Sequence, residues 1–149
     1  MAFKFEQLRV WQLSLEFGEK INLLTDQFPK KELFNLSSQI RRAADSIGLN
    51  IAEGSTGHTN AEQKRFLIFA NRSALEVVAC LIKARSRKYL DETTFKNFVC
   101  GLKSILYENK TRYSKQLATP IYGAGFRKIR EIHFTYQLQQ LCKTFCKME

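Results

Sequence analysis

The chain has 149 residues, of which 44% are apolar, and its formal net charge is +10. That length suits one domain with a hydrophobic core, and the apolar content excludes a disordered chain. No window approaches the roughly 20 consecutive apolar residues of a membrane span. Residues 1–11 mix charged with isolated apolar side chains, unlike a signal peptide, so we expect a cytoplasmic protein with no membrane association.

A first helix is predicted over Phe5–Gln27, where two adjacent apolar seams form a face wide enough for two neighbouring helices. Pro29 ends this helix, because proline disfavours the helical conformation in the residue before it. A second helix is expected over Leu36–Glu53, with Asn35 as its N-cap. Gly54 should close it in the left-handed conformation.

The third helix is predicted over Asn60–Tyr89. It begins with a capping box, in which Thr59 and Glu62 satisfy each other's backbone donors. Between Phe66 and Ile82 only four residues are polar, and a helix that is apolar nearly all round is buried on several sides. A single chain of this size can hardly bury it, so the sequence predicts a subunit contact and therefore a homo-oligomer.

A fourth helix should follow Asp91 and end at Pro120. The apolar spacing over residues 126–145 is compatible with a short extra C-terminal helix, and there are no alternating β-branched runs to indicate a sheet. The predicted fold is therefore all-α, an antiparallel up-down four-helix bundle over residues 1–118. Residues 119–149 would form a C-terminal extension.

The histidines and cysteines give little support to catalysis or metal binding. His58 lies near acidic and hydroxyl side chains, but nothing in the spacing requires a hydrolytic site there. Cys142 and Cys146 could form half of a zinc site with His133, although zinc sites usually show tighter paired spacing. Reduced thiols are the better interpretation. We expect no enzyme, no metal and no cofactor.

The excess positive charge lies entirely after residue 58. Residues 1–32 and 33–58 each carry equal numbers of basic and acidic side chains, whereas residues 59–90 carry seven basic and two acidic ones. Residues 91–118 add a net +2 and residues 119–149 a net +3. This asymmetry favours an anionic partner, of which nucleic acid is the commonest. The alternative is a solvated basic face that keeps the protein soluble.

Several motifs occur in order between Phe5 and Leu90. The most specific are Gln39-Ile-Arg-Arg-Ala-Ala44 and Asn50-Ile-Ala-Glu-Gly54, and others lie at 5–12, 24–36 and 66–76. In order and spacing the chain resembles the family first named for reading frames inside intervening sequences of bacterial 23S rRNA genes. This resemblance implies a four-helix bundle, a ring-like homopentamer, a nucleic-acid-binding role and no enzymatic activity. It extends more distantly to the accessory proteins of diversity-generating retroelements, basic pentameric bundles that bind RNA and a reverse transcriptase.

Polar residues of these motifs lie on or beside the apolar stripes, where buried charges must be paired. We expect a structural polar core made by Arg41, Arg42, Asn50, Glu53, Ser73 and Glu76. In it, Arg42 or Arg41 would pair with Glu76, while Asn50 and Glu53 would satisfy helix ends or partners in another subunit.

The candidate nucleic-acid contacts are basic side chains of the third and fourth helices. They are Lys64, Arg65, Lys83, Arg85, Arg87, Lys88, Lys96 and Lys103, and Lys110, Arg112 and Lys115 continue the fourth helix. The helix dipole offers another reason for basic residues at the end of the third helix. Two functions compete: an oligomer that binds nucleic-acid phosphates, and a structural or adaptor oligomer that docks an acidic protein, such as a reverse transcriptase or ribosome-associated protein. Only the first predicts binding that falls steeply with salt.

Overall fold

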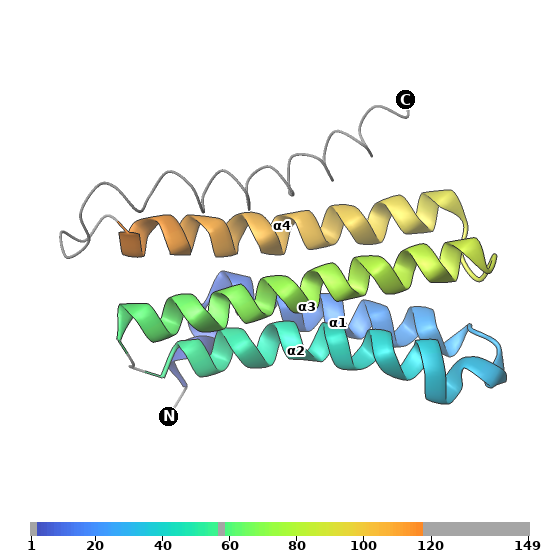
Figure 1. Cartoon of the computed structure of the whole chain (residues 1–149), viewed down its shortest axis with the longest axis horizontal. Helices are drawn as coiled ribbons and strands as arrows, with labels where there is room; N and C mark the ends of the chain where they lie inside the picture. The colour runs from blue at the N-terminus through green and yellow to red at the C-terminus, as the bar shows by residue number, and fades with distance from the viewer. Residues whose placement is uncertain (1–2, 57–58, 118–149) are drawn as a thin grey trace. The chain divides into compact units, whose positions relative to one another are not determined.

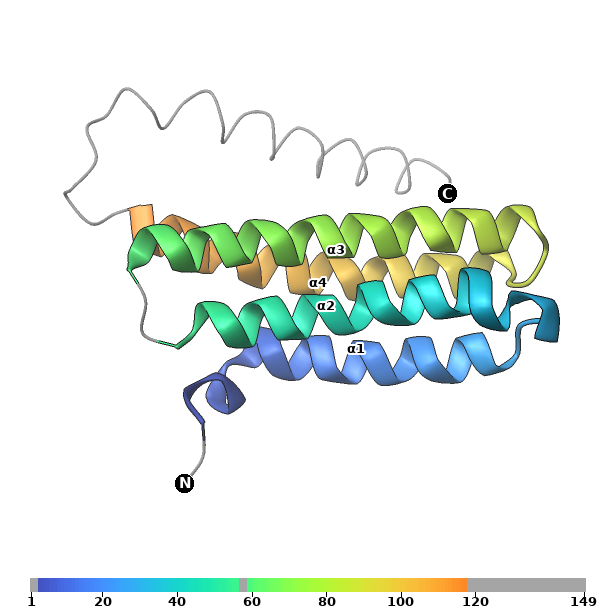
Figure 2. The ribbon, with the colours of Figure 1, turned by 60° about the horizontal axis from the view of Figure 1, so that its bottom comes forward.

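The computed structural model describes residues 3–56 and 59–117, and the chain divides into a first unit, residues 1–116, and a second, residues 117–149. The described helices are α1 (Arg9–Asp26), α2 (Ser38–Gly54), α3 (Asn60–Ser86) and α4 (Glu92–Leu117). They run alternately in opposite directions (Figures 1 and 2), and residues 3–56 and 59–117 contain no strand. The prediction of an all-α, up-down four-helix bundle is confirmed. The expected extra C-terminal helix lies outside the described residues.

Two segments differ from the prediction: the one before α1 and the connection between α1 and α2. A 3-10 turn, η1 (Lys4–Gln7), precedes α1, and the extended backbone of Leu8 separates the two. After Pro29, a 3-10 turn η2 (Lys30–Glu32) and a π-helical turn η3 (Leu33–Ser37) run directly into α2. Asn35 is therefore not an N-cap. Its side-chain amide donates instead to the Glu32 carboxylate at 3.2 Å.

The capping box at the start of α3 is confirmed. The Thr59 hydroxyl accepts from the Glu62 backbone N–H at 3.4 Å, and the Glu62 carboxylate accepts from the Thr59 N–H at 3.1 Å. Gly54 is the last helical residue of α2 and does not adopt the left-handed conformation predicted for it. That conformation occurs instead at Lys88 (φ 61°), beyond the end of α3. Gly54 serves a close approach, because a Cβ there would lie 2.9 Å from the Cβ of Phe66 on α3.

The core lies between the four helices. Its fully buried side chains are mostly branched aliphatic residues joined by one phenylalanine: Ile21, Ile40, Ile47, Leu81, Phe95, Leu102 and Ile105. On the α1–α4 side, Phe17 meets Phe98 edge to face, with ring centroids 5.9 Å apart. On the α3–α4 side, the buried Asn109 amide donates to Asn71 at 3.0 Å. A shift between α3 and α4 would break this bond and leave a buried amide donor and a buried amide acceptor unpaired, so the pair favours the observed alignment of the two helices.

Most apolar residues of α3 are buried within one chain. The large apolar side chains of α3 that stay exposed are Ile68 (36%) and Ile82 (40%). Burial of α3 therefore does not require a second subunit, and the predicted subunit contact stays a prediction. The more exposed leucines are Leu23 (66%) on α1 and Leu49 (68%) on α2. In the described residues, no helix combines the length and the apolar character that crossing a membrane requires.

Candidate nucleic-acid interface

The expected ion pair between α2 and Glu76 does not form. Arg41 turns toward α1, where its guanidinium donates to Asp26 at 2.6 Å and to the Thr25 hydroxyl at 2.6 Å. Glu76 is exposed, and its carboxylate accepts a hydrogen bond from the Gln39 amide. Arg42 and Glu53 are exposed as well, so no buried cation in the described part of the chain depends on Glu76.

Two members of the expected polar core, Asn50 and Ser73, form hydrogen bonds with Ser46 of α2. The hydroxyl groups of Ser46 and Ser73 are 2.9 Å apart, and Ser73 donates to the Phe69 carbonyl at 3.1 Å. The Asn50 amide donates to the Ser46 carbonyl at 2.7 Å. These bonds satisfy Asn50 and Ser73 inside one chain, which favours a structural role for both.

Two of the predicted nucleic-acid contacts, Arg85 and Arg87, form ion pairs within the chain. The Arg85 guanidinium donates to both carboxylate oxygens of Glu92, at 3.0 and 3.3 Å, and lies 4.0 Å from the centre of the buried Phe95 ring. The Arg87 guanidinium donates to both oxygens of Glu32 at 2.9 Å. These arginines join helix ends to each other, so they are poor candidates for contacts with nucleic acid.

Glu32 is the buried carboxylate of this arrangement, with 5% of its surface exposed. Burial by itself raises its pKa, but a hydrogen bond from the Tyr89 hydroxyl and the charge of Arg87 more than offset that effect. The pKa of Glu32 therefore lies below its ordinary value. The carboxylate stays ionised at neutral pH and neutralises Arg87.

The other candidates on and after α3 remain at the surface. Lys83 and Lys88 are exposed, and Lys64 at the start of the helix is half-buried. Arg65 is exposed and lies over the Phe69 ring, 5.4 Å from its centre. The exposed positions of Lys83, Lys88 and Arg65 leave them accessible to a solvent-borne anion.

Three of the predicted basic contacts of α4 form a row along the helix. Lys96, Lys103 and Lys110 recur every seven residues, so they share one side of the helix at intervals of roughly 10.5 Å. Tyr107 lies between the last two and is 70% exposed. We call these four residues the α4 lysine row. Tyr107 is not among the predicted contacts, although it lies four residues after Lys103 and three before Lys110, a spacing that places it on the same side of the helix.

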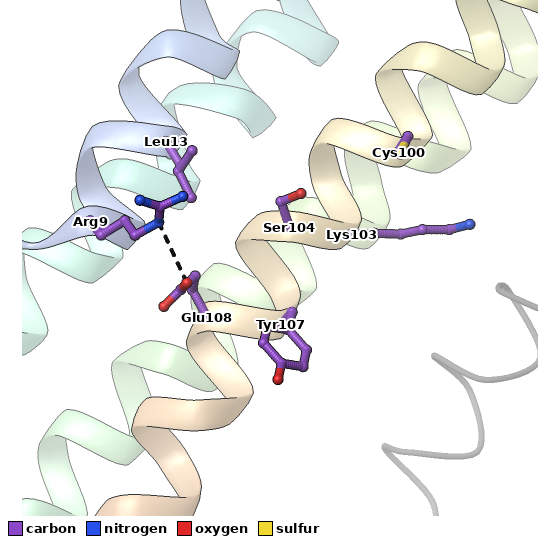
Figure 3. A pocket seen from close by; sticks show the side chains of 7 residues that line it. All are labelled: Arg9, Leu13, Cys100, Lys103, Ser104, Tyr107 and Glu108. Atoms are coloured by element: carbon purple, nitrogen blue, oxygen red, sulfur yellow. Dashed lines mark ion pairs between the residues drawn. The ribbon is translucent and has the colours of Figure 1, made fainter.

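Both acidic side chains of α4 are paired with arginines. Glu92 pairs with Arg85 at 3.0 Å, and Glu108 pairs with Arg9 of α1 at 3.6 Å. The Arg9–Glu108 pair crosses a shallow hollow of about 380 Å³ between α1 and α4, shown in Figure 3. Its lining comprises Arg9, Leu13, Cys100, Lys103, Ser104, Tyr107 and Glu108. Two members of the α4 lysine row thus border a partly apolar surface.

The net positive charge of the four helices lies on α3 and α4. Helix α1 has a net charge of −1 and α2 of zero, whereas α3 and α4 each carry five basic and two acidic side chains, a net +3. Among the described residues, no group of three or more histidine, cysteine or acidic side chains could hold a metal ion. The proposed zinc ligands and His58 lie outside these residues.

The comparison with protein families agrees with this architecture. The family model described as 23S rRNA-intervening sequence protein matches residues 6–107, which span α1, α2, α3 and most of α4. The chain belongs to this family. No curated protein matches this 23S rRNA-intervening sequence family member, and nothing supports the more distant resemblance to retroelement accessory proteins. Lys96 and Lys103 lie inside the matched region, and Lys110 lies just beyond it.

Proposed function

We propose that this protein is a non-enzymatic, cytoplasmic nucleic-acid-binding oligomer that contacts phosphates through α3 and α4. The observation that carries the proposal is the α4 lysine row on a helix whose two acidic side chains are both paired with arginines. Lysines attract phosphate groups through their charge, and on α4 five basic side chains outnumber two acidic ones. The family description refers to ribosomal RNA, which makes RNA the first ligand to test.

The arrangement suits contact with the nucleic-acid backbone rather than the reading of bases. Three lysines cover roughly 21 Å of helix, and each is a flexible point charge. In B-form DNA each strand places a phosphate about every 3.4 Å along the helix axis, so a row of this length meets several of them whatever the sequence. The exposed ring of Tyr107 adds one stacking surface, which is equally tolerant of sequence.

Self-association would strengthen this binding. The exposed leucines Leu15, Leu23 and Leu49 lie on α1 and α2, the helices without excess positive charge, and suit contacts between copies. A pentamer of chains that each carry +10 would total roughly +50. Light scattering at micromolar concentration should give a multiple of the chain mass. A mass of 17.3 kDa, that of one chain, would contradict the oligomer.

The decisive test compares two triple variants with the same change of charge. In K96Q/K103Q/K110Q the α4 lysine row is neutralised, whereas K4Q/K20Q/R42Q removes three exposed basic groups before α3. We expect only the first variant to weaken binding to RNA and DNA of any sequence. The slope of log affinity against log salt should flatten by about 0.7–0.9 for each phosphate that the variant no longer binds.

Two outcomes would contradict the proposal. If both variants bind like the parent, the α4 lysine row is not the interface. If the parent binds no nucleic acid at low salt but captures an acidic protein, the adaptor function replaces nucleic-acid binding.

A further inference from the structure

An aromatic side chain is exposed at the connection between α1 and α2. Phe34 is 92% exposed and its neighbour Leu33 is 48% exposed, whereas Leu36 and Ser37 of the same π-helical turn are buried. The turn therefore directs its later residues into the core and leaves Phe34 pointing away from it. The ring adds nothing to core packing, so the fold does not explain a phenylalanine at this position.

Exposed lysines lie at the same end of the bundle as this ring. Lys30 and Lys31 precede it in the connection, and Lys88 lies in the α3–α4 turn. Figures 1 and 2 both place this connection and this turn at the same end of the bundle, and the Arg87–Glu32 ion pair joins them. We call Lys30, Lys31, Leu33, Phe34 and Lys88 the connector end.

The carboxylates at this end are occupied inside the chain. Asp26 pairs with Arg41, Glu32 with Arg87, and Glu92 with Arg85, and Asp91 accepts the backbone N–H of Thr94 at 2.6 Å. In the described part of the chain, no carboxylate forms a salt bridge with Lys30, Lys31 or Lys88. The connector end therefore combines cations that form no salt bridge in the described residues with an exposed aromatic ring, which complements an anion that carries flat apolar groups.

We propose that the connector end binds unpaired nucleotides, with a base stacked on Phe34 and the flanking phosphates on Lys30, Lys31 and Lys88. This inference rests on the proposed function and adds a preference for single strands. Single-strand binders combine basic residues with aromatic rings on which bases stack, regardless of sequence. A duplex keeps its bases stacked on each other, so it can use the lysines but not the ring.

The test uses the full chain and one RNA sequence, offered as a single strand and as a blunt duplex. The variant F34A should weaken single-strand binding by on the order of 5- to 100-fold, since it removes one base–aromatic stack. Duplex binding should stay within about twofold of the parent, because a duplex does not use the ring. F34W should restore single-strand binding. The matched control is F3A, because Phe3 is also an exposed phenyl (67%) but precedes α1, at the opposite end of that helix from the connection.

Each result decides the question. If F34A binds the single strand like the parent, or weakens strand and duplex binding equally, the inference is wrong. If F34A changes the mass measured by light scattering, the ring serves self-association and the inference is wrong. The inference is also wrong if binding to anionic vesicles depends on Phe34 and RNA binding shows no preference for single strands, because the ring then serves a lipid surface. If the parent binds no RNA of either form, the proposed function itself fails. If the parent binds both forms through the α4 lysine row and F34A has no effect, only this inference fails.

Discussion

The Arg87 guanidinium donates to both oxygens of the Glu32 carboxylate at 2.9 Å, and so ties the α1–α2 connection to the turn that follows α3. Tyr89 supports the same carboxylate through its hydroxyl, and its ring packs against Phe28 with centroids 5.6 Å apart. One charged group thus holds together segments that are far apart in the sequence. Arg87, which the charge pattern alone assigns to nucleic acid, is used within the fold.

We predict that two charge-matched variants of the same region behave differently. R85Q/R87Q should lower the urea midpoint of unfolding, because it removes both ion pairs and the contact of Arg85 with the Phe95 ring. The ring contact alone is worth on the order of 1 kcal/mol. K83Q/K88Q removes the same charge from exposed side chains and should leave the midpoint unchanged. Equal midpoints in the two variants would show that these arginines are not structural.

The lowered pKa of Glu32 predicts a dependence of stability on pH. Its folded pKa lies below the unfolded value, so ionised Glu32 stabilises the fold fully above the unfolded pKa. That contribution disappears as the pH falls through the folded pKa. Asp91, whose pKa is lowered chiefly by the backbone N–H of Thr94, adds to the same trend. Urea midpoints should therefore decrease between neutral pH and the acid range.

The variant E32Q separates this effect from general acid denaturation. It should be less stable than the parent at neutral pH and should lose less stability on acidification. D91N should show the same pattern without affecting the α1–α2 connection. A parent and an E32Q variant with parallel pH profiles would show that Glu32 is not the group that titrates.

Local signals in the sequence predicted the elements well. The Thr59–Glu62 capping box lies within one helical turn, so four residues suffice to find the start of α3. The apolar repeat of α2 likewise identified its buried face, which includes Ile40, Ile47 and Ile51. Such patterns depend on helical geometry alone and need no knowledge of the neighbouring helix.

Contacts between distant segments could not be predicted this way. The sequence predicts that Arg41 or Arg42 pairs with Glu76 on α3, yet Arg41 pairs with Asp26 on α1 and Arg42 is exposed, because the pairing depends on which side of α2 each neighbouring helix occupies. Arg85 and Arg87 have the sequence pattern of surface cations, and only the fold brings Glu92 and Glu32 beside them. The α4 lysine row is different, since its seven-residue spacing is visible in the sequence. Whether acidic side chains neutralise that row depends on the neighbouring helices, which the spacing does not describe.

Two helical glycines, Gly18 of α1 and Gly54 of α2, give a matched pair of variants with opposite expected effects. A Cβ at Gly54 would meet the Cβ of Phe66 at 2.9 Å, and neither atom can move without shifting its helix. We expect G54A to destabilise the protein by about 1–3 kcal/mol, the usual cost of overpacking. A Cβ at Gly18 would meet the Asp45 carboxylate at 3.6 Å, an ordinary contact. G18A should therefore stabilise the fold by about 0.4–1 kcal/mol, because alanine loses less backbone entropy on folding. Urea unfolding measures both changes, and a G54A variant as stable as G18A would show that α2 and α3 do not approach closely at this position.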